Sequence, residues 1–403
     1  MRAVGIICEY NIFHNGHKRQ IDLLKKDGFD TVVCVMSGNF TQRGSLAIAD
    51  KYTRAKSAIM GGADLVFELP FPFSSLSAEG FAEAGVHILS SLGIKNISFG
   101  SECYDKELLK RAAKIIKSKE FIEKYSLEVK RGSAYAYFDT IKSILGEDQR
   151  LLSNDILAIS YISAIEKLSA DMEIFPIARE GSAYRDTELS GNLSSATALR
   201  QKIEKSGAGF ECLNEIHSPK AVISTLKEAQ KNCKCPVFID KIGNEILSFF
   251  RFLSPDEIAN RAVKRSGCGN CVADDGDGIV DRLCNQARAS KSFDEFINSS
   301  YNSRHTDARI KRVMLFSLLG VSDKLAKELP TYTTLLATNK QGRELLSQIR
   351  RSNTFPIVTK PADAPTNHQS SISALADSIY ATTMPECEYF DYFIKQSPYI
   401  ADF

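Results

Sequence analysis

Two histidines three residues apart, His14 and His17, are the side chains of this sequence best suited to hold a phosphate. They follow the apolar run Ala3–Cys8, which predicts a buried parallel strand, and they open a helical pattern over residues 16–26. Unpaired N–H groups at a helix start attract an anion, and an imidazole can donate to a phosphate oxygen. Gly16 between them lets backbone approach a ligand closely. We therefore predict a phosphate-binding loop; the alternative is a surface loop with two incidental histidines.

A second pattern of phosphate-binding residue types lies far along the chain, in residues 194–200, which read SSATALR. Its hydroxyl groups open a predicted helix, and Arg200 follows within the next two turns. Hydroxyls and a guanidinium in this order suit the β- and γ-phosphate oxygens of a nucleotide. The alternative is an ordinary helix with a Ser or Thr N-cap. The pairing of this segment with His14 and His17 favours phosphate binding.

The elements that must position these residues alternate between strand and helix. Apolar runs of strand length lie at residues 3–8, 31–36, 65–68, 96–99 and 173–177, and helical patterns lie between them at 16–26, 50–60 and 77–91. This alternation predicts an α/β fold with a Rossmann-like parallel sheet covered on both faces. Ligands of such sheets bind beyond the carboxyl ends of the strands. His14, Gly38, Glu68 and Gly100 all lie at or just after a strand end, so we expect them at one edge.

The strand signal fades after about residue 206. Helical patterns then lie at 238–250, 255–264, 279–289, 293–299, 307–319 and 371–380, with one candidate late strand at 356–358. We therefore predict two domains. Residues 1–205 form an α/β domain that contains both phosphate-binding patterns, and residues 206–403 form a mainly helical domain.

Composition excludes several classes of protein. Of the 403 residues, 43% are hydrophobic and 25% are charged, which is typical of a soluble globular protein. A net charge of +2 requires any nucleic-acid surface to be a local patch. The sequence lacks an apolar stretch long enough to cross a membrane and lacks a signal-peptide pattern. Ten cysteines in such a chain indicate reduced thiols, so we expect a cytoplasmic protein.

Two cysteine pairs raise the question of a metal. Cys233 and Cys235, with Cys268 and Cys271, could supply four thiolates to zinc, but the gap between the pairs exceeds the usual spacing. We predict no metal site and leave this alternative open. The sequence contains no GxxxxGK[ST] motif, which excludes a Walker-type ATP site.

The segment EYNIFHNGH at residues 9–17 resembles the HxGH signature of the nucleotidyltransferase superfamily. More narrowly, the chain resembles the bacterial tRNA(Met) cytidine acetate ligase family. Further blocks that carry this resemblance are residues 36–44 (MSGNFTQRG), 62–70 (GADLVFELP), 99–102 (FGSE) and 194–200. The blocks stand in the family's order, dense in the first half of the chain and sparse in the second.

The resemblance implies an enzyme that makes acetyl-AMP from acetate and ATP, with Mg²⁺ accompanying the ATP. It then transfers the acetyl group to the wobble cytidine of elongator tRNA(Met) and forms N4-acetylcytidine. His14, His17 and Arg200 are the implied catalytic residues. The other implied ATP contacts are Ile7, Cys8, Glu9, Tyr10, Asn11, Phe13, Asn15, Gly16, Lys18, Gln20, Gly100, Asn154, Arg179, Ser194, Ser195 and Thr197.

The remaining candidate residues concern acetate and tRNA. We assign acetate to the loop that follows the second predicted strand, with Gly38, Asn39, Gln42 and Arg43 as its candidates. The strongest local group of cations is Arg304, Arg309, Lys311 and Arg312, which we assign to tRNA. The alternative for such a charge run is a solvated helix face.

Two other functions stay open from the residues alone. A small-molecule nucleotidyltransferase would use the same two signatures to join AMP to a cofactor precursor, but would leave the helical second half without a purpose. A catalytically silent RNA-binding protein would not need His14, His17 and Arg200 intact. We expect tRNA, ATP and acetate as partners, and neither a membrane nor a protein partner.

Overall fold

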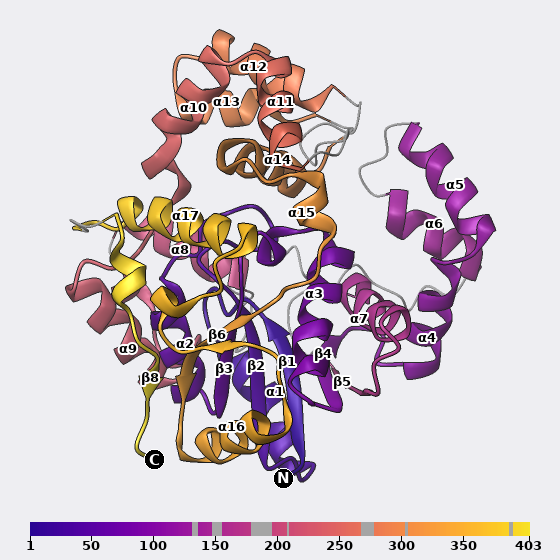
Figure 1. Ribbon diagram of the computed structural model, residues 1–403, viewed down its shortest axis with the longest axis vertical. Helices are drawn as coiled ribbons and strands as arrows, with labels where there is room; N and C mark the ends of the chain where they lie inside the picture. Colours follow the sequence, from indigo (N-terminus) through magenta and orange to yellow (C-terminus); the bar gives the residue numbers. More distant parts are fainter. Residues whose placement is uncertain are drawn as a thin grey trace.

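The computed structural model describes residues 1–130, 136–146, 155–178, 196–207, 209–266, 278–302, 305–386 and 390–403. Their strands form one sheet in the order β5-β4-β1-β2-β3-β6-β7, with β8 paired to β6 (Figure 1). The bounds of the strands are β1 Ala3–Cys8, β2 Thr31–Ser37, β3 Leu65–Leu69, β4 Asn96–Ser101, β5 Glu173–Ala178, β6 Thr333–Thr338, β7 Ile357–Val358 and β8 Tyr399–Ile400.

The predicted α/β fold is confirmed. The five strands from the first half, β1 to β5, pair in parallel, and each lies where an apolar run predicts it. Cys8 of β1 lies opposite Met36 of β2, and Met36 lies opposite Glu68 of β3. These three residues therefore share one row near the carboxyl ends of their strands.

Helices cover both faces of the sheet because the strands are apolar on both sides. On one face lie α1 (Asn15–Lys26) and α2 (Lys51–Met60), which pack on side chains such as Val32 and Met36. On the other face α3 (Ala78–Ser91), α7 (Asp155–Lys167) and α16 (Lys340–Ser352) pack on Val33 and Val35. The alternation of faces along β2 explains why its residues are buried throughout.

Strand β6 was not predicted from the sequence. Its six residues are fully buried and pair antiparallel with β3, and Thr333 donates from its hydroxyl to the Glu68 carbonyl at 2.6 Å. The predicted late strand is confirmed as β7, beside β6. The last part of the chain thus returns to the sheet of the first half and closes the edge at β3.

The further helices described in the second half are α8 Ala196–Ser206, α9 Lys220–Lys231, α10 Gly243–Phe252, α11 Pro255–Ser266, α12 Ile279–Ala289, α13 Phe293–Ser300, α14 Asp307–Leu319, α15 Asp323–Lys327 and α17 His368–Thr383. In this half, α10 to α14 and α17 lie where helical patterns predict them, whereas α9, α15 and α16 were not predicted. In Figure 1, α10 to α14 form a group above the sheet, and α17 runs across the top of the strands. In the first half, α4 (Lys106–Ile115), α5 (Lys119–Lys130) and α6 (Ala136–Leu145) extend to one side. Among the described residues, no helix is long and apolar enough to span a membrane.

Candidate active site

The loop between β1 and α1 uses its two histidines to begin the helix. His14 is the N-cap of α1: its Nδ1 accepts from the Gly16 N–H at 3.0 Å, while the His14 N–H donates to Nδ1 of His17 at 3.3 Å. Because both Nδ1 atoms accept, the proton of each neutral ring is assigned to Nε2. The rings stack with centroids 3.7 Å apart. Each Nε2–H is therefore a hydrogen-bond donor held in a fixed orientation.

Aromatic side chains beneath the loop fix the orientation of His17. The His17 ring lies 4.7 Å from the ring of Tyr10 and 5.5 Å from that of Phe13, and both aromatic residues are buried. Tyr10 and Phe13 themselves meet edge to face at 4.9 Å. Their packing makes the imidazole part of a rigid surface rather than a mobile side chain. These two predicted ATP contacts thus have a positioning role in the structure.

The second half of the chain anchors the same loop. The Asn15 N–H donates to the His217 carbonyl at 3.0 Å, and Asn15 Nδ2 donates to the carbonyls of Glu215 and Ile216 at 2.9 and 2.8 Å. Ser218 donates from its hydroxyl to the Phe13 carbonyl at 2.8 Å. The amide hydrogens of Asn15 therefore bind backbone, so Asn15 holds the loop in place.

Arg200 of α8 reaches the end of β1, as the sequence predicts. Its guanidinium donates to the Asn11 carbonyl and, at 3.1 Å, to the Thr197 hydroxyl. Burial lowers the pKa of Arg200, and the Glu9 carboxylate opposes this effect. Two segments almost two hundred residues apart thus meet beside the histidine loop. Asn154, Arg179, Ser194 and Ser195 lie outside the described residues.

The remaining predicted ATP contacts lie around this junction. Ile7 and Cys8 belong to β1, and Gly100 lies near the end of β4. On α1, Gln20 donates from Nε2 to the Ser98 hydroxyl at 3.1 Å, and Lys18 pairs with Asp22. Gln20 thereby ties α1 to β4.

Arg54 of α2 was missed by the sequence analysis and holds the strand ends together. It is 1% exposed and donates to the carbonyls of Ala49 at 2.9 Å and Glu9 at 2.6 Å. It also donates to the carbonyls of Ser37, at 3.0 Å, and Gly38. Burial lowers its pKa. An arginine on the inward face of an amphipathic helix pattern is the signal that could have found it.

The loop assigned to acetate, residues 38–44, lies between β1 and α14. The Gln42 N–H donates to Glu9 Oε1 at 2.7 Å, and Arg312 donates to the Gln42 carbonyl at 3.3 Å. Gly44 has φ +69°, and a side-chain carbon there would lie 2.4 Å from the Arg312 backbone nitrogen. Only glycine therefore lets this loop approach α14 so closely. The charge of Arg43 acts on Arg200, so this loop brings a further cation to the junction.

Among the cations assigned to tRNA, Arg309, Lys311 and Arg312 belong to α14, the helix that contacts this loop. Burial, with the nearby charge of Arg309, lowers the pKa of Arg312 to about 10. Lys311 pairs with Asp307 at 3.1 Å. Arg304 lies outside the described residues. Of these cations, Arg312 contacts the loop through its side chain, at the Gln42 carbonyl.

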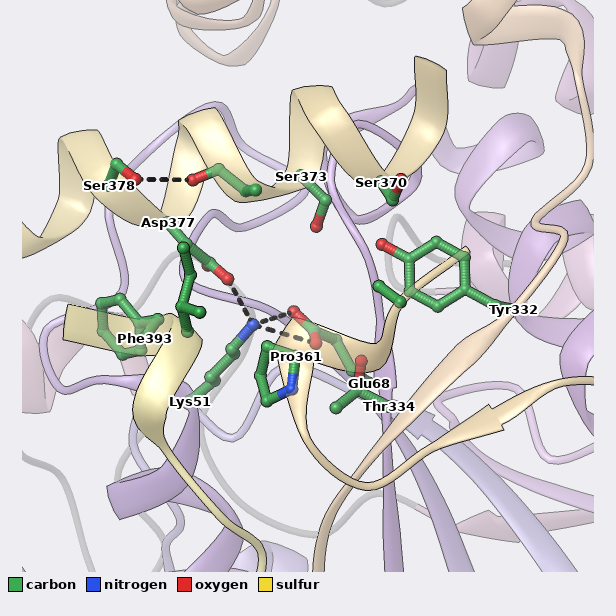
Figure 2. A pocket seen from close by; sticks show the side chains of 13 residues that line it. Lys51, Glu68, Tyr332, Thr334, Pro361, Ser370, Ser373, Asp377, Ser378 and Phe393 are labelled. Carbon is green, nitrogen blue, oxygen red and sulfur yellow. Dashed lines mark hydrogen bonds and ion pairs between the residues drawn. The ribbon is translucent and has the colours of Figure 1, made fainter. Parts of the chain in front are cut away.

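Asn39, a candidate for acetate, links the loop to α17. Its Nδ2 donates to Asp377 Oδ1 at 2.8 Å, and its Oδ1 accepts from the Lys51 N–H at 2.8 Å. Lys51 Nζ in turn donates to Asp377 Oδ2 at 2.6 Å and to the two Glu68 oxygens at 2.7 and 2.9 Å (Figure 2). Burial raises the pKa of Asp377 to about 6, although Lys51 opposes it.

The described residues contain no group of His, Cys, Asp and Glu side chains that could hold a metal ion. Cys235 is buried and Cys233 is half-buried, while Cys268 and Cys271 lie outside the described residues. Burial raises the pKa of the Cys235 thiol above its ordinary value.

Comparison with known proteins identifies close counterparts. The model of the HIGH Nucleotidyl Transferase family matches residues 1–392. The tRNA(Met) cytidine acetate ligase of Acetivibrio thermocellus is 33% identical in an alignment of length 383 that covers 90% of this chain and 89% of that protein. The protein of the same name from Clostridium perfringens strain SM101 is 34% identical in an alignment of length 406 that covers 96% of each chain.

Solved structures agree over the whole chain. Thermotoga maritima TmcAL in its apo form I superposes with a TM-score of 0.88 at 29% identity, covering 100% of both chains. The crystal structure of the same protein bound with alpha-thio ATP superposes with a TM-score of 0.86 at 28% identity, again covering 100% of both chains.

Proposed function

The chain belongs to the HIGH nucleotidyl transferase family and, within it, to the tRNA(Met) cytidine acetate ligases, and from this premise we propose the reaction that it performs. It activates acetate with ATP and transfers the acetyl group to the wobble cytidine of elongator tRNA(Met). The observation that supports this most is the meeting of three segments at the end of β1: the His14–His17 pair, Arg200 and the loop at residues 38–44.

In the first step, an acetate oxygen attacks the α-phosphorus of ATP and pyrophosphate leaves. The enzyme's contribution to such a step is positioning and charge stabilisation. The Nε2–H groups of His14 and His17 bind phosphate oxygens. The first N–H groups of α1 hold the loop itself, since those of Asn15 and Gly16 donate to the His217 carbonyl and to His14 Nδ1, so the helix adds only the positive end of its dipole. Arg200, which donates to the Asn11 carbonyl of the same loop, adds a cation. Mg²⁺ would be held mainly by the triphosphate, as is usual for this ion.

In the second step, the N4 amine of the cytidine attacks the acetyl carbonyl. A C–N bond forms, the bond between the carbonyl carbon and the phosphate oxygen breaks, AMP leaves, and N4 loses one proton to solvent. Since the adenylate is already a reactive acyl donor, the step requires no covalent enzyme intermediate. We place the reaction in the cytoplasm, since ten cysteines indicate reduced thiols.

For the binding of tRNA we propose the helical group α10 to α14, with Arg304, Arg309, Lys311 and Arg312 contacting phosphates. The division into residues 1–205 and 206–403 assigns ATP to the sheet and tRNA to these helices, although β6, β7 and β8 return to the sheet. Contact between Arg312 and Gln42 would place the bound tRNA next to the acetate loop.

One assay tests the proposal. The protein is incubated with ATP and labelled acetate, with and without tRNA, and both label in tRNA and pyrophosphate are measured. Label in N4-acetylcytidine at the wobble position is the expected result. Pyrophosphate release only with another acceptor would indicate a small-molecule nucleotidyltransferase, and the absence of any ATP turnover would indicate an RNA-binding protein without catalysis.

A further inference from the structure

A pocket lies at the carboxyl end of β3, under α17 and next to the start of β6 (Figure 2). It encloses about 430 Å³ of empty space, part of it open to solvent. Lys51, Glu68 and Asp377 form its inner end, and Tyr332 and Phe393 contribute aromatic rings to its lining. The enclosed part is only about 40 Å³, which is room for a small polar edge of a ligand, so the rest of that ligand would lie in the open mouth.

The charged inner end of this pocket calls for a ligand that donates hydrogen bonds. Lys51 has three N–H donors, and all three bind the oxygens of Glu68 and Asp377. Two carboxylates face one ammonium, so the group carries one excess negative charge at neutral pH, buried from water. Carboxylate oxygens can accept further hydrogen bonds, whereas Lys51 has none left to give. An anion such as acetate is therefore disfavoured here.

The hydroxyl groups around this inner end point to a polar occupant. Thr334 is 3% exposed and lines the pocket, and its hydroxyl makes no hydrogen bond to any of the described residues. Tyr332 and Ser373, both buried, lie with their hydroxyls close together on the same side (Figure 2). The Thr334 hydroxyl is not among the fully enclosed, unpartnered polar atoms of the described residues, so it is open to the pocket and can donate to or accept from a ligand there.

The position of the pocket fits the order of the reaction. Glu68 shares a row with Cys8 through Met36, so the pocket lies two strand spacings, about 10 Å, from the end of β1. The acetate loop lies between them, because Gly38 approaches Glu68 so closely that a side-chain carbon there would lie 2.6 Å from Oε1. Along the edge of the sheet, the loop with His14 and His17 is followed by the acetate loop, residues 38–44, and then by this pocket.

We propose that this pocket receives the acceptor base, a pyrimidine with an exocyclic amine, and presents it to the acetyl group. This inference rests on the proposed function. Carboxylate oxygens accept from the N4 amine of cytosine, as they do in nucleic-acid readout, and the hydroxyls donate to its ring acceptors. Uracil presents an oxygen at the same position and is rejected by the carboxylates. An enzyme that modifies a base must take it out of its stack, and aromatic rings in the pocket replace that stacking.

Measuring adenylate formation and acetyl transfer separately distinguishes a pocket for the acceptor base from a pocket with another role. Acetate-dependent exchange between ATP and pyrophosphate reports adenylate formation, and acetylation of tRNA from synthetic acetyl-AMP reports transfer. Ala374→Phe fills the pocket mouth from an exposed position of α17. It should lower kcat/KM for tRNA in the transfer reaction at least tenfold while the exchange rate stays within twofold. Thr334→Val and Ser373→Ala, each of which deletes one hydroxyl, should lower transfer severalfold with the same selectivity.

Ser371→Ala on the exposed side of the same helix is the matched control and should leave both rates unchanged. Transfer at the wild-type rate in Ala374→Phe would overturn the inference. An equal fall of both half-reactions would also overturn it, because the pocket would then serve only to hold the acetate loop through Asn39. If the wild-type protein itself fails to acetylate tRNA, the proposed function fails instead. Binding of cytidine over uridine, measured by saturation-transfer NMR and lost in Ala374→Phe, then still tests the pocket.

Discussion

The two ends of the catalytic edge of the sheet are built with opposite polarity. At the end of β1, the histidine loop carries the imidazole donors of His14 and His17, and Arg200 adds a cation. At the end of β3, Lys51 is neutralised by Glu68 and Asp377, and acceptor oxygens remain in excess. One end suits an anion and the other suits a donor. A single sheet can thus hold a triphosphate and an amine about 10 Å apart without either site attracting the other ligand.

Adenylate formation at the histidine loop should show the largest effect, because it depends on single hydrogen-bond donors. His17→Asn keeps an acceptor near the His14 N–H, so α1 still begins in place, but it removes the Nε2–H donor. We expect acetate-dependent exchange between ATP and pyrophosphate to fall about 100- to 1000-fold, the range seen when one preorganised donor is deleted. The exchange rate and the affinity for tRNA, by filter binding, are measured side by side.

His17→Gln makes the opposite change. Its amide places a donor near the position of Nε2 but removes the acceptor for the His14 N–H. We expect this variant to keep a higher exchange rate than His17→Asn. His87→Ala removes a half-buried histidine of α3 away from the loop and should leave exchange unchanged. Equal rates for His17→Asn and the wild type would show that phosphate binding depends on backbone alone.

Changes to the Lys51 cluster at the end of β3 should alter the stability of the fold rather than the rate of ATP–pyrophosphate exchange. Lys51→Met leaves two buried carboxylates without their cation, and we expect a loss of about 3 kcal/mol in the free energy of unfolding. Urea unfolding followed by circular dichroism measures this. Lys95→Met, in a fully exposed pair with Asp171, is the control and should not shift the midpoint. An unchanged midpoint in Lys51→Met would mean that the buried pair contributes no net stability.

The contrast between the two ends also explains what could be predicted from the sequence. The His14–His17 pair was found because chemistry, glycine and strand end all lie within a few consecutive residues. Arg200 was found because its own segment opens a helix with hydroxyls. The Lys51 cluster was not found, because Asp377 lies 326 residues away and neither Lys51 nor Asp377 stands out within its own helix. Arg54 was missed for the same reason, since its partners are backbone carbonyls that carry no sequence signature.

The strands of the sheet also differ in whether they could be predicted from the sequence. Strands β1 to β5 are long apolar runs, and periodicity alone placed them. Strand β6 contains three threonines, which favour strands, but its apolar residues form no run as long as those of β1 or β2 and it follows a series of helices, so the search for apolar runs did not find it. Its burial comes from β3, α2 and α16, which it meets only after folding. Tertiary contact, rather than intrinsic preference, makes it a strand.

The smallest expected effect concerns the surface that joins the two ends to tRNA. Arg309→Gln with Arg312→Gln removes two cations beside the acetate loop, and we expect about a tenfold loss of tRNA affinity at moderate salt. The slope of log Kd against log salt should fall by about 1 to 2, because fewer counterions are released on binding. Lys231→Gln with Lys241→Gln, which removes the same charge from other parts of the second half, is the control and should keep the wild-type slope. Binding measured from 50 to 300 mM salt gives both the affinity and the slope. An unchanged slope in the arginine variant would place the tRNA surface away from α14. The wobble base would then reach the acetate loop without contact between the tRNA and this helix.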